Sequence, residues 1–309
     1  MSNTMTVDNV IPRADIISQG ARLGAEIKNI KLSDDLTEGV VAAISRLLLE
    51  HKVIFFRDQG HLDDAQQQRF AIRLCSVRQH PALADTERSL TIRETLSDRG
   101  YRRVDQMNVD AGFGATGPKI SVLRGAVVPL YGGDIAWSST AAAYLDLPES
   151  LRMLADNLWA LHCSTYDYGA TGRATSADMP HFDDVFTGTI YEAAHPVVRV
   201  HPATGERMLV LGHSVRHFVG LQKNTSDKLF VLLQSYLTAP ENTVCWSWKS
   251  GDVAIWDNRA TEHRALDQIG GQDRTLGPVA GDDDVPLGIV GRRSVAQIKR
   301  PKPQAAKAA

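Results

Sequence analysis

Two hydrophobic periods divide the chain into helical and extended segments. Apolar residues recur every three or four positions over residues 37–51, and this spacing predicts an amphipathic helix. A second helix is predicted over residues 63–74, with an aspartate near its N-terminal cap. The same reasoning predicts two further helices, over residues 148–162 and 226–235.

Short apolar runs bounded by polar residues indicate buried strands. Such runs cover residues 23–27, 53–56, 120–128, 135–137, 196–200, 208–211, 243–248 and 252–256, with a hairpin turn at 201–205. The segments 82–120 and 164–190 are polar, and we interpret them as loops, with one strand near residues 106–113. Many short strands and few helices predict a mainly β fold with flanking helices, as in an antiparallel sandwich or jelly roll.

The chain shows no internal repeat and no Gly/Ser linker that would divide it. We predict a flexible N-terminal arm over residues 1–14 and a single domain over residues 15–296. The last segment, 297–309, is rich in proline, lysine and alanine and is predicted to be a disordered tail.

Composition narrows the partners and the compartment. The net charge is −2, with 34 basic and 36 acidic residues among 309, so neither nucleic acid nor an anionic membrane is an expected partner. Three scattered cysteines form no disulfide framework, which favours a reducing compartment. The sequence has no signal-peptide core and no long apolar run, and we therefore expect a cytoplasmic protein.

The most specific motif is GDVAIWDNRATEH, residues 251–263, in which an apolar run ends in Trp-Asp-Asn and His263 follows. Further motifs are KVIFFR at 52–57, HP at 80–81, YGGD at 131–134 and HPVVRVHP at 195–202. Together they resemble the taurine dioxygenase family, the TauD/TfdA-like Fe(II)/2-oxoglutarate-dependent oxygenases, and most of all its alkylsulfate- and taurine-cleaving members. The resemblance covers roughly residues 20–293.

The resemblance implies a double-stranded β-helix (jelly roll, cupin-like) core that binds Fe(II) and 2-oxoglutarate. Such oxygenases hold iron with two histidines and one carboxylate on one face of the metal. The resemblance therefore implies that Asp110 and His263 are catalytic metal ligands. Arg274 has the family spacing of the arginine that pairs with the distal carboxylate of 2-oxoglutarate, for which a planar guanidinium is suited. His80 and Phe113 match positions that contact the substrate.

Three positions depart from the family pattern. Counting back from the YGGD motif places Asn108 at the first histidine ligand, and no histidine lies between His80 and His162 to replace it through a register shift. Ile135 occupies the position of a threonine that contacts 2-oxoglutarate, and Pro278 that of an arginine that faces the substrate. The carboxamide of Asn108 is a weaker donor to Fe(II) than imidazole, so we expect a metal affinity below the family norm.

Three functions follow from these residues. The first is a variant dioxygenase for a small organic substrate, in which Asp110 and His263 hold iron and Asn108 or water takes the third position. The second is a metal-independent, redox-neutral enzyme in which Asp110 and His263 transfer protons. The third is a non-catalytic subunit that pairs with an intact homologue. The resemblance also suggests a homo-oligomer, either a dimer or a tetramer.

The remaining histidines have simpler interpretations. His195 and His201 flank a strand and its turn, and we expect both to be structural. Four others are weaker candidates for a replacement metal ligand: His162, His181, His213 and His217. The loops 82–120 and 164–190 are expected to form a lid over the pocket.

Overall fold

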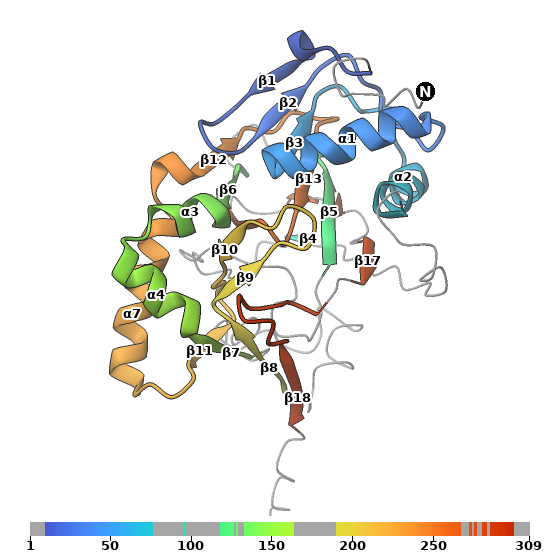
Figure 1. The fold of residues 1–309 in the computed structure, drawn as a ribbon. Helices are drawn as coiled ribbons and strands as arrows, with labels where there is room; N and C mark the ends of the chain where they lie inside the picture. The colour runs from blue at the N-terminus through green and yellow to red at the C-terminus, as the bar shows by residue number, and fades with distance from the viewer. Residues whose placement is uncertain are drawn as a thin grey trace, which may run out of the picture.

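The computed structural model describes residues 10–76, 95–96, 118–126, 128, 133–163, 190–266, 272–273, 275–276, 280–282 and 285–299. Strands occupy the centre of the molecule, and helices lie on two sides of it (Figure 1). The helices are α1 (Glu38–His51), α2 (Asp64–Ser76), α3 (Thr140–Asp146), α4 (Glu149–Asn157) and α7 (Lys223–Leu237). Within these ranges, no helix combines the length and the hydropathy that crossing a membrane requires.

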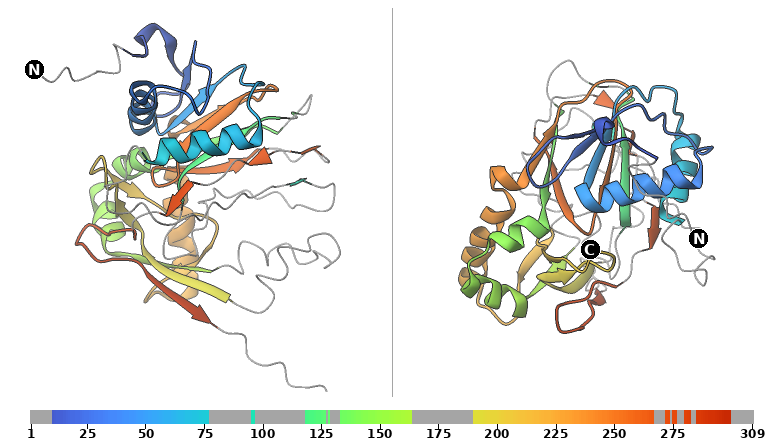
Figure 2. Two further views of the ribbon diagram at one scale, coloured as in Figure 1. Left: turned by 90° about the vertical axis from the view of Figure 1, so that its right-hand side faces the viewer. Right: turned by 45° about the horizontal axis from the view of Figure 1, so that its top comes forward.

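The largest sheet has seven strands, in the order β1-β2-β3-β13-β5-β16, and β17 pairs with β5 as well. These strands are β1 (Ile16–Ser18), β2 (Ala25–Ile27), β3 (Val53–Phe56), β5 (Pro118–Arg124), β13 (Val253–Asp257), β16 (Thr275–Leu276) and β17 (Ala280–Asp282). Helices α1 and α2 cover one face of this sheet (Figure 2), where Ile54, Phe56 and Ile255 pack into the apolar cluster beneath them. The opposite face is therefore free to meet a second layer.

That second layer is a three-stranded sheet in the order β12-β6-β14. Its strands are β6 (Ile135–Ser139), β12 (Thr243–Trp246) and β14 (Thr261–Ala265). Aromatic side chains fill the space between the two sheets. The rings of Phe55 and Trp246 stack with centroids 4.2 Å apart, and those of Trp137 and Trp256 meet edge to face at 5.5 Å. We call the faces that bear these residues the inner faces.

The remaining strands form a four-stranded sheet, β11-β7-β8-β18, a short hairpin, β10-β9, and a two-stranded pairing of distant segments, β15-β4. Their bounds are β4 (Thr95–Leu96), β7 (Trp159–Cys163), β8 (Ile190–Pro196), β9 (Val198–Val200), β10 (Arg207–Leu209), β11 (Val215–Phe218), β15 (Gln272–Asp273) and β18 (Val295–Lys299). Apolar residues of α3, α4 and α7 pack with β7, β9, β10 and β11 in one cluster, which includes Ala160, Leu209 and Phe218.

The structure confirms a mainly β chain with flanking helices. The helices predicted over residues 37–51 and 63–74 correspond to α1 and α2, and the one over 226–235 lies within α7. Thr37 caps α1, because its side chain accepts a hydrogen bond from the Val40 N–H. The eight predicted strands all match observed strands, although β10 is shifted by one or two residues and β12 ends earlier than predicted. The strand predicted over 106–113 lies outside the described residues.

The helix predicted over residues 148–162 is wrong in its second half. Helix α4 ends at Asn157, and Trp159–Cys163 forms β7 between β8 and β11. Burial alternates from Trp159 to His162, as in a strand with one packed face, so tertiary pairing overrides the local helical pattern. Also not predicted were helix α3 and the strands β1, β4, β11 and β14 to β18, and β8 begins six residues before the predicted strand at 196.

Both predicted domain boundaries also shift. Ile11 is fully buried in the core, and a 3₁₀ turn forms at Arg13–Asp15, so the packed chain begins inside the segment we predicted as an arm. At the other end, β18 pairs with β8 as far as Lys299, which is inside the predicted tail. In both places a few apolar or strand-forming residues find partners that the local sequence does not reveal.

Candidate functional site

His263 lies on β14, with its side chain on the inner face. In the β14–β6 register His263 is opposite Trp137, and directly opposed residues of an antiparallel pair point to the same side of the sheet. The imidazole ring is 5.2 Å from the Trp256 ring, centroid to centroid, at a tilt of 57°. His263 is only partly buried, so the imidazole is held against the aromatic core and still reachable.

Ile135, the position predicted to face 2-oxoglutarate, shares this face. It is 6% exposed and pairs with Ala265 on β14 and with Trp246 on β12. Ile135 and His263 are therefore diagonal neighbours across β6 and β14. The structure brings together the two predicted site residues that it describes.

The other predicted site residues lie outside the described residues: His80, Asn108, Asp110, Phe113 and Arg274. Pro278 also does. Their assignments therefore remain predictions. Short strands are described on both sides of Arg274, and the second of them, β16, pairs with β5 of the large sheet.

The inner face suits a polar ligand beside His263. The indole nitrogens of Trp137 and Trp256 are buried, and neither has a hydrogen-bond partner within the described part of the chain. A buried donor of this kind is normally satisfied, and such exceptions call for an explanation. Among the described residues no three metal-ligating side chains converge, so His263 contributes one donor and further ligands have to come from elsewhere. One partly buried imidazole fits one position of an iron site.

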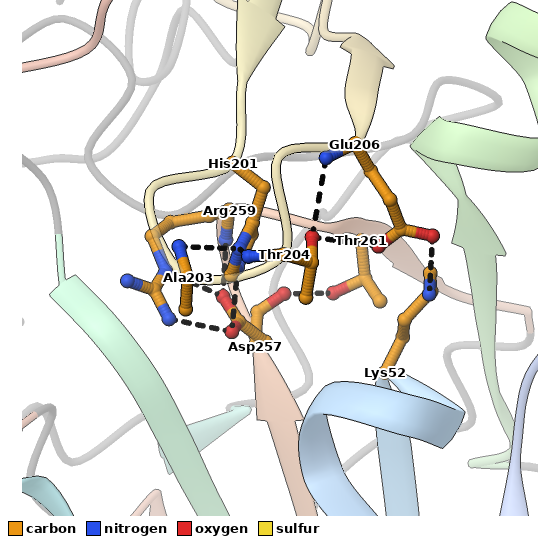
Figure 3. Close-up of polar contacts among 8 residues, drawn as sticks. All are labelled: Lys52, His201, Ala203, Thr204, Glu206, Asp257, Arg259 and Thr261. Carbon is orange, nitrogen blue, oxygen red and sulfur yellow. Dashed lines mark hydrogen bonds and ion pairs between the residues drawn. The ribbon is translucent and has the colours of Figure 1, made fainter. Parts of the chain in front are cut away.

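A buried carboxylate, Asp257, fixes the turn that precedes His263. Asp257 ends β13 and is 1% exposed. Its Oδ1 accepts hydrogen bonds from Arg259 N (3.0 Å) and Nε (2.8 Å), and its Oδ2 accepts one from Arg259 Nη2 (2.7 Å). Thr261 Oγ1 donates to the Asp257 carbonyl oxygen at 2.9 Å. These contacts close the short connection from β13 to β14, as Figure 3 shows.

His201, from the turn between β9 and β10, reaches the same carboxylate. Its Nε2 lies 3.1 Å from Asp257 Oδ2, and its Nδ1 accepts hydrogen bonds from Ala203 N (3.2 Å) and Thr204 N (3.1 Å). The prediction that His201 is structural is confirmed by these contacts. We call His201, Asp257 and Arg259 the Asp257 cluster. This cluster could not be predicted from local patterns, because His201 and Asp257 are 56 residues apart.

The electrostatics of Asp257 match this arrangement. Burial alone would raise the pKa of the carboxyl, but the hydrogen bonds from Arg259 and His201 outweigh it and hold the pKa well below its usual range. The Asp257 carboxylate is therefore charged, and the guanidinium of Arg259 balances it inside the protein.

Glu262 occupies the opposite face of β14 and is fully buried. Burial raises its pKa to about 7, although hydrogen bonds from the N–H groups of Leu211 (2.7 Å) and Gly212 (3.1 Å) favour the charged form. These bonds tie β14 to the segment between β10 and β11. Sequence reasoning missed Glu262, because β14 (Thr-Glu-His-Arg-Ala) is polar along its length and an acidic residue does not stand out in it.

His162 and His195 form a second buried pair, away from the inner face. Their rings meet edge to face at 5.0 Å, His162 Nδ1 lies 2.8 Å from Ser214 Oγ, and His195 Nδ1 lies 2.6 Å from Ser294 Oγ. His195 is therefore structural, as predicted. Burial, reinforced by unfavourable electrostatic interactions with His195, Arg199 and His213, lowers the pKa of His162 well below 6.5.

This shift predicts an acid-dependent loss of stability. The unfolded chain protonates His162 near pH 6.5, whereas the folded chain resists protonation until well below that value. Stability from this group is therefore present above pH 6.5 and is lost as the pH falls, by up to about 1.4 kcal/mol per pH unit. A His162→Asn variant keeps a polar atom near Ser214 but cannot titrate. Denaturant unfolding from pH 7 to 5 should show a smaller loss in the variant than in the wild type, and parallel curves would contradict this.

Comparisons with known proteins identify the family of the chain. The model of the family described as taurine catabolism dioxygenase TauD, TfdA family matches residues 16–277. An alpha-ketoglutarate-dependent sulfate ester dioxygenase from Pseudomonas putida is 45% identical over 91% of this chain and 93% of its own length. An alkylsulfatase from Acinetobacter baylyi is 39% identical over 96% of this chain and 94% of its own.

Solved structures give the same result. The crystal structure of a taurine dioxygenase from Burkholderia xenovorans superimposes with a TM-score of 0.70 and 32% sequence identity, and covers 91% of this chain and 95% of that one. The family match spans most of the chain, including β13, β14 and His263. The chain therefore belongs to the TauD, TfdA family.

Proposed function

We propose that this protein is an Fe(II)- and 2-oxoglutarate-dependent oxygenase that acts on a small organic substrate from a double-stranded β-helix core. The observation that carries the proposal is His263, which follows the Trp-Asp-Asn motif and sits on the inner face against Trp256. The sulfate ester dioxygenase relative, named for its dependence on alpha-ketoglutarate, supports it over 91% of the chain.

His263 and Asp110 would hold the iron, with the carboxamide of Asn108 or a water molecule in the remaining protein position. Two strong protein donors in place of three should lower the affinity for Fe(II). When bound, Fe(II) and 2-oxoglutarate supply the O₂-dependent oxidation of a substrate carbon. Arg274 would pair with the distal carboxylate of 2-oxoglutarate through two parallel hydrogen bonds.

The chain's other residues would shape the pocket around that centre. Ile135 adds an apolar wall on the inner face, and the Trp137 and Trp256 rings exclude water from one side of His263. His80 and Phe113 would contact the substrate. Pro278 offers no hydrogen bond where an arginine would face an anion, so we expect weaker selection for sulfates and sulfonates than in taurine-type members.

Turnover of 2-oxoglutarate tests the proposal. The purified protein would be incubated with Fe(II), ascorbate, 2-oxoglutarate and O₂, alone and with alkyl sulfates, sulfonates or aryloxy acids, and succinate and sulfate would be measured. We expect succinate formation that a substrate stimulates and that a chelator abolishes. Conversion of any of these substrates that continues in chelator would contradict the proposal and indicate metal-independent chemistry.

Restoring the missing imidazole should strengthen metal binding. We expect Asn108→His to raise the affinity for Fe(II) at least about tenfold, because imidazole is a better ligand than a carboxamide. Even a residue that only hydrogen-bonds a metal ligand changes metal affinity by about tenfold or more. Anaerobic competition with a chelator of known affinity measures the change. Val109→His is the matched control, since residues 106–113 are predicted to form a strand, in which the next side chain points the other way. Equal affinity in the wild type and Asn108→His would contradict the assignment of residue 108.

The compartment and assembly are part of the same proposal. Cys75 and Cys163 are buried thiols and Cys245 is an exposed thiol, and none of the three forms a disulfide, which suits the reducing cytoplasm. We expect a homo-oligomer, dimer or tetramer, and a small molecule as the substrate. Light scattering on the purified protein would determine its mass.

A further inference from the structure

We propose that His201 and Asp257 are positioning residues, which hold His263 in the orientation that binds the metal. This inference rests on the proposed function of His263. Neither His201 nor Asp257 belongs to the predicted ligand set, so both would act on His263 through the structure that connects them.

The connection between β13 and β14 decides where His263 points. Strand β13 is paired along both edges, with β3 and with β5, so its position is fixed. Only residues 258–260 separate it from β14, which belongs to the other sheet. The chain must reverse there so that Trp256 and His263 face each other at 5.2 Å. A small change in this turn would therefore swing the imidazole relative to the large sheet.

Hydrogen bonds account for each residue of the connection. Asn258 N donates to the Lys119 carbonyl (3.0 Å) and Ala260 N to the Asp257 carbonyl (3.1 Å). Arg259 donates three times to the Asp257 carboxylate. The Ala260 carbonyl accepts from Thr140 N at 3.1 Å, at the start of α3. The Asp257 side chain is the centre of this arrangement, because it binds the turn ahead of it by both oxygens.

His201 adds an anchor from a third part of the fold. Figure 3 shows its ring between the backbone of its own turn and the Asp257 carboxylate. Two backbone N–H groups donate to Nδ1, so Nδ1 carries no proton. The proton is therefore on Nε2, which donates to Asp257 Oδ2. This fixed tautomer is the form of histidine that can join the β9–β10 turn to the end of β13.

The β9–β10 turn is itself held in place. Glu206 Oε1 lies 3.2 Å from Lys52 Nζ, at the end of α1, and Thr204 Oγ1 donates to Glu206 at 2.9 Å. Leu209 of β10 is fully buried in the apolar cluster formed with α3, α4 and α7. His201 therefore fixes the Asp257 carboxylate relative to the β9–β10 turn, which is itself held in place. Partners that hydrogen-bond a metal ligand directly typically contribute 10- to 100-fold to metal affinity, and we expect the lower end of this range here, because His201 and Asp257 act on His263 through the connecting turn.

Two substitutions of His201 separate its two contacts. His201→Asn places a carboxamide near the Nδ1 position, where it can still accept from Ala203 and Thr204, but it is too short to reach Asp257. His201→Gln extends to the Nε2 position and can still donate to Asp257, but it leaves the turn N–H groups without their acceptor. Glu206→Gln is the matched control, because it weakens the pair with Lys52 in the same turn and leaves Asp257 untouched.

Two readouts distinguish positioning from folding. Anaerobic Fe(II) affinity is measured in the presence of 2-oxoglutarate, and thermal unfolding shows which variants stay folded. Side-chain ¹⁵N signals of the histidines in the metal-free protein, with the His263 signal assigned from a His263→Gln variant, report the ring itself. We expect His201→Asn to weaken Fe(II) binding on the order of 10-fold and to shift the His263 signal, with His201→Gln and Glu206→Gln close to wild type.

The inference would be overturned if folded His201→Asn bound Fe(II) as tightly as Glu206→Gln does and its His263 signal did not move. A loss of affinity in His201→Gln as large as in His201→Asn would do the same, because the bond to Asp257 would then be irrelevant. If the wild-type protein itself binds no Fe(II), the proposed function fails, and the histidine spectra alone decide whether His201 orients the ring.

Discussion

Replacing His263 with alanine should abolish Fe(II) binding and 2-oxoglutarate turnover. The variant removes the imidazole on the inner face that we assign to the metal. Indirect partners of a ligand are worth 10- to 100-fold in affinity, so loss of the ligand itself should exceed about 100-fold. Chelator competition measures the affinity, and succinate formation measures the turnover. The fold should survive, because His263 is only partly buried.

His217→Ala is the matched control for this loss. His217 is also partly buried, but it lies on β11 opposite Leu161, in a different sheet from β14. It was one of the candidates for a replacement ligand, so the control also tests that alternative. Unchanged affinity in His263→Ala would refute the site, and a large loss in His217→Ala would move the metal to another part of the fold.

Replacing Asp257 with alanine should cost about 3–5 kcal/mol in the free energy of unfolding, because removing one partner of a buried ion pair leaves the other charge uncompensated. Here the uncompensated charge is that of Arg259, whose side chain is 11% exposed, and His201 also loses its acceptor. The Asp257 side chain is itself only 1% exposed, so water cannot readily replace the lost bonds. Denaturant unfolding at pH 7 measures the effect.

Asp227→Ala provides the comparison for this stability prediction. Asp227 pairs with Lys223 at 2.7 Å on the surface of α7, where the two side chains are 53% and 85% exposed. Exposed pairs four residues apart in a helix contribute about 0.3–0.5 kcal/mol. A loss in Asp257→Ala no larger than in Asp227→Ala would show that the Asp257 cluster does not stabilise the connection between the sheets.

The sequence was informative where the pattern is local. The apolar spacing over 37–51 is enough to define α1, and the Trp-Asp-Asn motif identified His263 from a dozen consecutive residues. Residues 159–163 show the opposite case. Burial alternates over the first four of these residues, one residue after the end of a helix, and only pairing with β8 and β11 makes them a strand. Four alternating residues are too few to be recognised as a strand when the helical spacing of the preceding residues can be continued through them.

The polar contacts around His263 could not be predicted, because they join distant segments. Glu262 accepts hydrogen bonds from Leu211 and Gly212, which precede it by 51 and 50 positions. His201 and Asp257 are 56 positions apart. Each looks like an ordinary charged or turn residue until the sheets are assembled. The resemblance placed Asp110 and Arg274 in the pocket by family pattern, and those placements remain predictions.

One spectroscopic titration tests the central claim, that His263 belongs to an iron centre that also binds 2-oxoglutarate. Fe(II) is added without oxygen to the purified protein with 2-oxoglutarate, and the visible absorption is followed for the metal-to-ligand charge-transfer band of the chelated cosubstrate. We predict a saturable band in the wild type, at lower Fe(II) concentration in Asn108→His, and none in His263→Ala. No band in either the wild type or Asn108→His, with no metal retained by elemental analysis, would contradict the account.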